Sequence, residues 1–266
     1  MEGKIMFKKT LFSICAILTT TSAANATNVT PYYLTDGDSD IAYEIVNGVV
    51  TNSFSTFHYG YPIAVRDSIW LGHRNDNGAR EYSLAGISTG NTSAGGNNFT
   101  QLLDGAGGNN VNYGVECCGS TNSVTIANTD WSNQTALFDL DFAGTGIAYD
   151  FVTNSLFISE FGSIIRNYDL NGQLIQSYNL GMRLIGLAYE TATDSLWGFN
   201  RSTDNLVQFD KNGNILQDVD IAGFNPRNPY GGEMRVSNVP TVPEPAPLAL
   251  LGLGLLGLGL ARKRRG

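Results

Sequence analysis

Ile147-Ala148-Tyr149-Asp150 is followed, forty residues later in the chain, by Leu187-Ala188-Tyr189-Glu190. A second tetrapeptide, Asn154-Ser155-Leu156-Phe157, returns at the same offset as Asp194-Ser195-Leu196-Trp197. Because these matches share one frame, they indicate a structural unit of about 40 residues that the chain uses more than once.

Each unit is predicted to contain four short strands. Apolar and polar residues alternate within the segments, which is the period of a half-buried strand. Asn171-Gly172 recurs 41 residues later as Asn212-Gly213, and such pairs suit tight hairpins because both residues tolerate positive φ. The predicted strands are 147–151, 155–160, 164–169 and 173–180 in the first unit, and 185–190, 195–200, 205–210 and 214–221 in the second.

Fainter copies of the unit lie upstream. Residues 63–70 echo the pattern of residues 147–157. Residues 46–54 resemble residues 170–178 and precede them by 124 residues, which is close to three periods. The repeat therefore extends over most of the chain.

The intervening sequence is less regular. Segments 123–126 and 137–140 are candidate strands of a degenerate copy, whereas the Gly- and Asn-rich stretch 90–119 is expected to be a long loop. Residues 27–40 are polar and are expected to be irregular.

Four antiparallel strands in about 40 residues is the size of one propeller blade. The sequence therefore predicts an all-β fold, a β-propeller-like array of about five four-stranded blades. Ring closure would pair an early strand, 41–46, with a strand near 233–236, which removes exposed sheet edges. A β-sandwich is the alternative, because it accommodates the same number of strands.

Aromatic residues are plentiful, with 12 Tyr, 13 Phe and three Trp. Tyr32-Tyr33 and the segment 57–61 could stack on sugar rings if they are exposed. Most strand aromatics are expected to form the core between blades, including Phe157, Trp197, Phe199 and Phe209.

The central part of the chain is acidic. Seven of the 16 basic residues and one of the 24 acidic residues lie outside residues 27–261, which leaves nine basic against 23 acidic residues there. This balance argues against a nucleic-acid partner, because phosphates require a basic face. It is compatible with solubility outside the cell or with divalent cations.

Asp36, Asp38 and Asp40 place carboxylates at alternate positions, as at the start of a calcium loop. Ile41 stands where the turn glycine should be, and Asn47 stands where the bidentate Glu should be. The three aspartates are therefore candidate metal ligands, with calcium as the candidate ion, and a solvated acidic turn is the alternative.

Cys117 and Cys118 are adjacent and are too close in sequence to supply a zinc site with the two distant histidines. In an oxidising compartment the pair could close into a vicinal disulfide that stiffens a loop. Two unpaired thiols, or a bond to another chain, are the alternatives.

No catalytic residue is predicted. Gly86-Ile87-Ser88-Thr89-Gly90 has the spacing of a nucleophile elbow, but no helix signal follows it. The acids Asp150/Glu190 and Asp169/Asp210 recur at matching turn positions. Repetition of this kind favours a structural role, and the body is expected not to be an enzyme.

The N-terminus has the pattern of an export signal. Lys8-Lys9 provide a basic start, Leu11 to Leu18 an apolar centre, and Ala24-Asn25-Ala26 a small-x-small cleavage site. Residues 1–26 are therefore predicted to be a signal peptide that the export translocon and signal peptidase process.

The C-terminus combines three features in a fixed order. Pro243-Glu244-Pro245 is followed by an apolar run, 246–261, and by the basic residues Arg262, Lys263, Arg264 and Arg265. A helix over about 16 residues spans roughly 24 Å, so it can cross a bilayer whose core thins. The basic residues would hold its end on the cytoplasmic side.

This tail resembles the PEP-CTERM sorting tail of Gram-negative bacteria. The resemblance rests on Pro243-Glu244-Pro245, the apolar run and the basic stop, and it covers residues 242–266. It implies an exosortase partner and processing at or near the tripeptide. It implies nothing about the rest of the chain.

The sequence thus predicts a signal peptide (1–26), an exported β-propeller-like domain (27–239) and a sorting tail with a transmembrane helix (240–266). The chain is expected to cross the inner membrane, to be anchored transiently by its C-terminal helix, and to reach the cell envelope or extracellular matrix. There its non-catalytic body would bind exopolysaccharide or surface proteins. The alternative is a calcium-dependent propeller lactonase or glycan-active hydrolase, which would need carboxylates or an Asp–His pair at the central channel.

Overall fold

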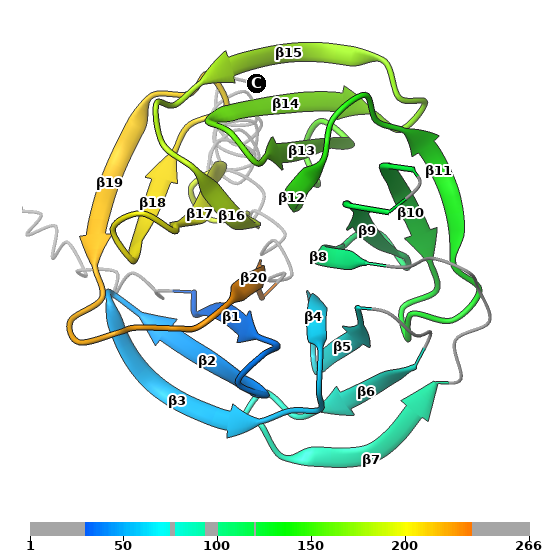
Figure 1. Cartoon of the computed structure of the whole chain (residues 1–266), viewed down its shortest axis with the longest axis vertical. Coiled ribbons are helices and arrows are strands. Elements are labelled where there is room, and N and C mark those ends of the chain that lie inside the picture. The colour runs from blue at the N-terminus through cyan, green and yellow to red at the C-terminus, as the bar shows by residue number, and fades with distance from the viewer. Residues whose placement is uncertain (1–29, 75–77, 94–100, 120, 236–266) are drawn as a thin grey trace, which may run out of the picture.

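The computed structural model describes residues 30–74, 78–93, 101–119 and 121–235, which form twenty β-strands. The strands make five four-stranded antiparallel sheets, arranged as blades around a common axis (Figure 1). The predicted all-β propeller is therefore confirmed, and the sandwich alternative is wrong. The predicted signal peptide, sorting motif, transmembrane helix and basic stop lie outside the described residues.

We letter the blades A to E in chain order and give the strands of each blade from the axis outward. Blade A contains β20 (Pro229–Met234), β1 (Tyr32–Asp36), β2 (Ile41–Val46) and β3 (Val49–Ser55). Blade B contains β4 (Gly60–Val65), β5 (Ile69–His73), β6 (Ala79–Tyr82) and β7 (Ser88–Ser93). Blade C contains β8 (Leu102–Gly107), β9 (Asn112–Glu116), β10 (Ser123–Ala127) and β11 (Thr135–Asp139). Blade D contains β12 (Gly144–Asp150), β13 (Ser155–Glu160), β14 (Ile164–Asp169) and β15 (Leu174–Asn179), and blade E contains β16 (Leu184–Glu190), β17 (Ser195–Asn200), β18 (Asn205–Phe209) and β19 (Ile215–Asp220).

The sequence repeat corresponds to whole blades. Its two clear copies are blades D and E, and β13, β14 and β17 have the predicted bounds. The offset of 124 residues joins the β2–β3 turn of blade A to the β14–β15 turn of blade D, three blades further on. The two candidate strands of the degenerate copy are β10 and β11 of blade C.

Ring closure uses a strand that the sequence reasoning placed in an irregular segment. β20 pairs with β1, with Tyr32 opposite Met234 and Tyr33 opposite Glu233. The predicted partner, β2, lies one strand further out and pairs with β1 instead. The prediction failed because β1 is only five residues long, so its alternation was too short to recognise.

The stretch 90–119 is not a long loop, contrary to the prediction. It supplies the end of β7 and all of β8 and β9, the two innermost strands of blade C. Its glycines are needed because neighbours approach closely. A Cβ on Gly105 would lie 2.4 Å from the Trp131 ring, and one on Gly114 would lie 2.8 Å from Thr125 Oγ1.

The core lies between adjacent blades. Phe157, Phe199 and Phe209 are fully buried, and Trp197 is partly buried against the cluster shared by blades A and E, which confirms their predicted place. Tyr32 and Tyr33 are also buried, so the prediction that they could stack on sugar rings is wrong. Their rings pack inside the molecule because β1 is the second strand of its blade, covered on both faces.

In blades D and E, a glycine in the turn between the third and fourth strands lies against the preceding blade. Gly172 has φ +80°, and a Cβ there would lie 2.9 Å from Phe138 Cβ of β11. Gly213 has φ +85° and would meet the Tyr178 ring of β15 at 2.5 Å. The Asn-Gly signal in the sequence therefore marks both a tight turn and a close contact between blades.

The propeller has two distinguishable faces. Every blade has four antiparallel strands, so the outermost strand of one blade ends at the face where the innermost strand of the next begins. We call this the start face and the opposite one the end face. β1 is antiparallel to β20, so the described chain enters and leaves the propeller at the end face.

Candidate binding site

Aromatic side chains gather on the start face where blades A and B meet. The group, which we call the aromatic cluster, consists of Phe57, His58 and Tyr59 before β4, Tyr61 in β4, His73 in β5 and Tyr230 in β20. The ring of Phe57 stacks on that of His73 with centroids 5.8 Å apart, and Tyr59 stacks on Tyr61 at 6.3 Å. Tyr61 meets Tyr230 edge-on at 5.6 Å, so the rings form one connected group.

Part of the aromatic cluster is accessible from solvent. The His58 side chain is 61% exposed, and Phe57 and Tyr59 are half-buried. Tyr61 is buried and supports the others from below. Of the segment 57–61, which was predicted to offer rings if exposed, the loop residues before β4 are therefore the accessible ones.

Arginines lie over three rings of the aromatic cluster. The guanidinium carbon of Arg80 is 4.9 Å from the Phe57 ring centre, and that of Arg201 is 5.2 Å from the Tyr230 ring centre. Arg74 lies 5.4 Å above the buried Tyr61. Cation–π attraction holds each guanidinium beside a ring, which combines positive charge with aromatic surface.

A polar network fixes the inner part of the cluster. The Tyr61 hydroxyl donates to Asp38 Oδ1 at 2.7 Å, and Asn228 Nδ2 donates to Asp38 Oδ2 at 3.1 Å. Arg201 in turn donates to Asn228 Oδ1 at 3.0 Å. Burial and the Asp38 carboxylate raise the pKa of Tyr61, so its hydroxyl stays protonated and keeps the ring in place.

A pocket of about 370 Å³ opens beside the aromatic cluster at the start face of blade B. Its walls include Phe57, His58, His73, Arg80, Thr92 and Ser93. This volume is at the lower end of the range for small-ligand sites, which combine aromatic walls with a few polar groups. The pocket and the cluster together form the candidate site.

The three aspartates proposed as metal ligands have separate protein partners. Asp36 accepts hydrogen bonds from the backbone N–H groups of Arg227 and Asn228, at 2.7 and 3.1 Å. Asp40 lies 3.1 Å from His58 Nδ1, and Asp38 belongs to the network around Tyr61. Within the described part of the chain, no group of three or more His, Cys, Asp or Glu side chains is positioned to hold a metal ion.

A carboxylate that the sequence did not predict lies at the centre of the ring. Asp104 of β8 is fully buried, and its Oδ1 accepts from the backbone N–H groups of Gly105 and Gly232 at 2.8 Å each. Its Oδ2 accepts from Ile147 at 2.8 Å and Leu187 at 2.9 Å. One side chain thus joins the innermost strands of blades A, C, D and E.

The donors around Asp104 define its chemistry. Burial raises its pKa, and the N–H donors of Ile147, Gly232 and Gly105 oppose that rise. Both oxygens are already engaged by backbone N–H donors, and the Glu233 carboxyl group lies close enough to raise the pKa of Asp104 further. The four hydrogen bonds give Asp104 a role in the scaffold.

A second buried carboxylate lies nearby. Glu233 of β20 accepts from the backbone N–H of Gly107 at 2.7 Å and from that of Met234 at 3.0 Å. Burial raises the pKa of Glu233 to about 8, although those donors and the charge of Arg66 lower it. The closing strand is thus tied directly to blade C.

The repeated acids are structural, as their repetition predicted. Asp169 Oδ1 accepts from the N–H groups of Asn171 and Gln173, and Asp210 Oδ1 accepts in the same way from Asn212 and Asn214. Both carboxylates therefore stabilise the turn between the third and fourth strands of their blades.

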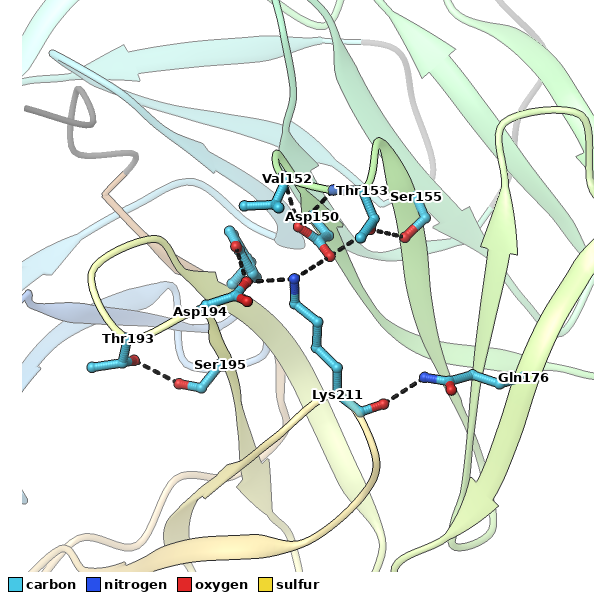
Figure 2. Close-up of polar contacts among 10 residues, drawn as sticks. Asp150, Val152, Thr153, Ser155, Gln176, Thr193, Asp194, Ser195 and Lys211 are labelled. Carbon is cyan, nitrogen blue, oxygen red and sulfur yellow. Dashed lines mark hydrogen bonds and ion pairs between the residues drawn. The ribbon is translucent and has the colours of Figure 1, made fainter. Parts of the chain in front are cut away.

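Asp150 joins blade D to blade E. Figure 2 shows Lys211 of blade E reaching between Asp150 and Asp194, with Lys211 Nζ 2.7 Å from Asp150 Oδ2. Burial alone would raise the pKa of Asp150, but hydrogen bonds from Lys211 and Thr153 lower it below its ordinary value. The ionised pair therefore connects blades D and E at the end face, away from the candidate site.

Cys117 and Cys118 are joined in a vicinal disulfide. The pair lies at the end of β9 on the start face of blade C, with Cys117 buried and Cys118 exposed. Ser88, the central residue of the elbow-like motif, begins the exposed outer strand β7. Its backbone is a strand and not the strand–turn–helix that a nucleophile elbow needs.

Comparisons with known proteins identify the tail. Residues 241–265 match the family model of the PEP-CTERM protein-sorting motif. The chain thus carries the sorting signal that marks exported proteins for exosortase processing, as its C-terminal sequence predicted. Among the described residues, no helix is long and apolar enough to cross a membrane.

The body resembles solved structures in fold alone. A chain of the crystallised nidogen/laminin complex superposes with a TM-score of 0.55 and 9% identity, covering 76% of this chain and 83% of that one. A protein of unknown function from Bacteroides caccae gives a TM-score of 0.49 with 13% identity, over 72% of this chain and 73% of that one. A functionally unknown protein from Desulfotomaculum acetoxidans gives 0.45 with 16% identity, over 76% and 74%. No sequence among curated proteins matches the chain.

Proposed function

We propose that this exported, exosortase-sorted propeller is a non-catalytic binding protein of the cell envelope or extracellular matrix, and that it holds exopolysaccharide through its aromatic cluster. The observation that carries the proposal is the accessible group of rings on the start face, beside a pocket of saccharide size. The sorting motif supports a place of action where polysaccharide is abundant.

The chemistry of the aromatic cluster suits a sugar. One face of a pyranose ring presents C–H bonds, which pack favourably on the negative face of an aromatic ring. The half-buried Phe57 and Tyr59 offer such surface, and Arg80 and Thr92 offer donors to hydroxyl or acidic groups. Because backbone hydrogen bonds from Tyr59 to Gly37 and from Arg74 to Tyr59 hold the loop before β4, little ordering is required when a ligand binds.

Sorting is tested by following the size and location of the protein in fractionated cells. Substitution of Pro243 and Pro245 by Ala, or removal of the exosortase, is expected to leave an unprocessed chain in the membrane fraction. An unchanged size and distribution in both cases would contradict the assigned role of the tail.

Binding is tested by measuring how much protein the isolated exopolysaccharide retains. Tyr59→Ala is expected to weaken retention roughly fivefold, from the loss of about 1 kcal/mol of ring stacking. Phe161→Ala is the matched control, because Phe161 is 38% exposed and lies in the β13–β14 connection of blade D, on the same face outside the aromatic cluster. Equal retention of the two variants would refute the proposed site.

A specific observation favours one alternative, a glycan-active hydrolase. His58 lines the pocket and its Nδ1 lies 3.1 Å from Asp40 Oδ1, which is an Asp–His pair on the start face. Under this alternative, His58→Gln would abolish the release of new reducing ends from polysaccharide while binding persists. Under the binding proposal, neither the native protein nor the variant releases reducing ends.

A further inference from the structure

We propose that the pocket of blade B selects a sugar residue that carries a carboxylate, with Arg80 as the group that contacts it. This inference rests on the proposed binding function and specifies its ligand as an acidic glycan built from carboxylated pyranose units.

The first support is the shape of the pocket. Phe57 and His73 stack with an angle of 14° between their ring planes, and together they form an aromatic part of the pocket wall. The lining also includes the polar residues Thr92 and Ser93 at the end of β7. A pocket that combines aromatic surface with polar groups matches a pyranose ring, whose faces are apolar and whose rim bears hydroxyl groups.

The second support is the charge of Arg80. It is the one arginine or lysine among the residues that line the pocket, and it is exposed. None of the ion pairs between described residues includes Arg80, whereas Arg166 and Arg235 are each paired with carboxylates. The ring of Phe57 holds the guanidinium at 4.9 Å, which fixes its position without neutralising it.

The third support is the match between guanidinium and carboxylate. Arginine presents its N–H donors in a planar fork that binds a carboxylate through two parallel hydrogen bonds. A neutral sugar would leave that charge uncompensated. Thr92 lies opposite Arg80 in the β6–β7 register, so a hydroxyl partner is available beside the carboxylate contact.

The overall acidity of the protein does not exclude an acidic ligand. Charges on the surface are screened over about 8 Å at physiological ionic strength. Acidic groups on the end face therefore have little effect at the pocket, and the acid beside the pocket, Asp40, lies 3.1 Å from His58 Nδ1. The same screening predicts that added salt weakens binding of the acidic probe.

The experiment compares two probes that differ only in the carboxylate. Oligogalacturonate and the same oligomer after chemical reduction of its carboxyl groups are titrated calorimetrically into the full-length chain in detergent micelles. We expect the acidic probe to bind roughly tenfold more tightly, and Arg80→Gln to remove that preference without changing affinity for the reduced probe. Arg80→Lys is expected to keep part of the preference, since it retains charge but not the fork.

Arg235→Gln is the matched control, because Arg235 is an exposed arginine paired with Asp67 at the end face. It should leave both affinities unchanged, and circular dichroism checks that every variant is folded. Equal binding of the two probes, or an unchanged preference in Arg80→Gln, would overturn the inference while leaving the proposed function intact. Failure of the acidic probe to bind would also overturn the inference. If isolated exopolysaccharide did not retain the native protein, the proposed function itself would be overturned.

Discussion

At the scale of single residues, the most consequential side chain is a buried acid with no catalytic role. Asp104 accepts four backbone hydrogen bonds at the ring centre, from strands of four different blades. The backbone groups nearest the axis would otherwise have few partners, because the innermost strand of each blade has a neighbour on one side only. A carboxylate is small and has enough lone pairs to satisfy several of them.

Replacement of Asp104 by Asn should therefore destabilise the whole ring. The amide keeps one acceptor oxygen but turns its NH2 group toward two backbone N–H donors, which costs about 3 kcal/mol of unfolding free energy. Urea denaturation followed by tryptophan fluorescence measures this loss.

Asp169→Asn is the matched control for Asp104→Asn, since the oxygen that accepts from Asn171 and Gln173 is retained in a turn at the surface. Little change is expected there. If Asp104→Asn were as stable as Asp169→Asn, the central carboxylate would not hold the blades together.

The sequence contained no signal for Asp104. It follows Leu103 and precedes Gly105 in a stretch whose glycines and asparagines are typical of loops. The role of Asp104 depends on backbone N–H groups that lie 43 to 128 positions away in the sequence. These groups come close to Asp104 in space only when the propeller ring closes. Asp169 and Asp210 were predictable because their partners lie within four residues.

At the scale of elements, the turns between the third and fourth strands determine how one blade packs on the next. Gly172 and Gly213 both have positive φ. A Cβ atom added to either glycine would lie less than 3 Å from an aromatic side chain of the preceding blade. A side chain there meets two separate costs, one from the backbone conformation and one from the contact with the preceding blade.

Gly172→Ala and Gly181→Ala separate these two costs. Both glycines have positive φ, at +80° and +71°, but a Cβ on Gly181 would meet no atom within 4 Å. Gly181→Ala should cost about 1 kcal/mol from the backbone alone, and Gly172→Ala about 2 to 3 kcal/mol, because Phe138 must also move. Thermal denaturation of the two variants gives the comparison, and equal losses would show that the contact between blades is unimportant.

The elements of blades D and E could be predicted closely because hairpin turns and alternation are local properties of the sequence. Strands β1, β8 and β9 could not. In β1 the pattern is short, and in β8 and β9 the glycines needed for close packing of Trp131 resemble loop residues. The aromatic segment 57–61 indicated where the candidate site lies. The presence of His73, Arg80 and Tyr230 in that site could not be predicted, because it depends on how the propeller places blades A and B side by side.

At the scale of the whole molecule, closure of the ring depends on buried carboxylates. Glu233 lies on the strand that closes blade A, and it joins that strand to Gly107 of blade C. Burial raises its pKa to about 8 from an ordinary value of 4.5, so the folded protein binds a proton there that the unfolded chain releases.

Stability should consequently fall as the pH rises. The contribution of protonated Glu233 is fully present below about pH 4.5 and is lost as the pH passes through about 8, with a slope of at most about 1.4 kcal/mol per pH unit. Glu233→Gln, which is neutral at every pH, should flatten this part of the profile. Urea midpoints measured from pH 5 to pH 9 test it, and identical slopes for the native protein and the variant would contradict the assignment.

The position of the two chain ends has a consequence for display at the cell surface. The described chain both enters and leaves at the end face, and six residues separate Arg235 from Val242, so the two are at most about 25 Å apart. An exosortase that binds the sorting signal therefore approaches the end face of the propeller. The aromatic cluster lies on the opposite, start face. Under the proposed binding function, a molecule still held at the membrane could already bind polysaccharide, so capture would not have to wait for release.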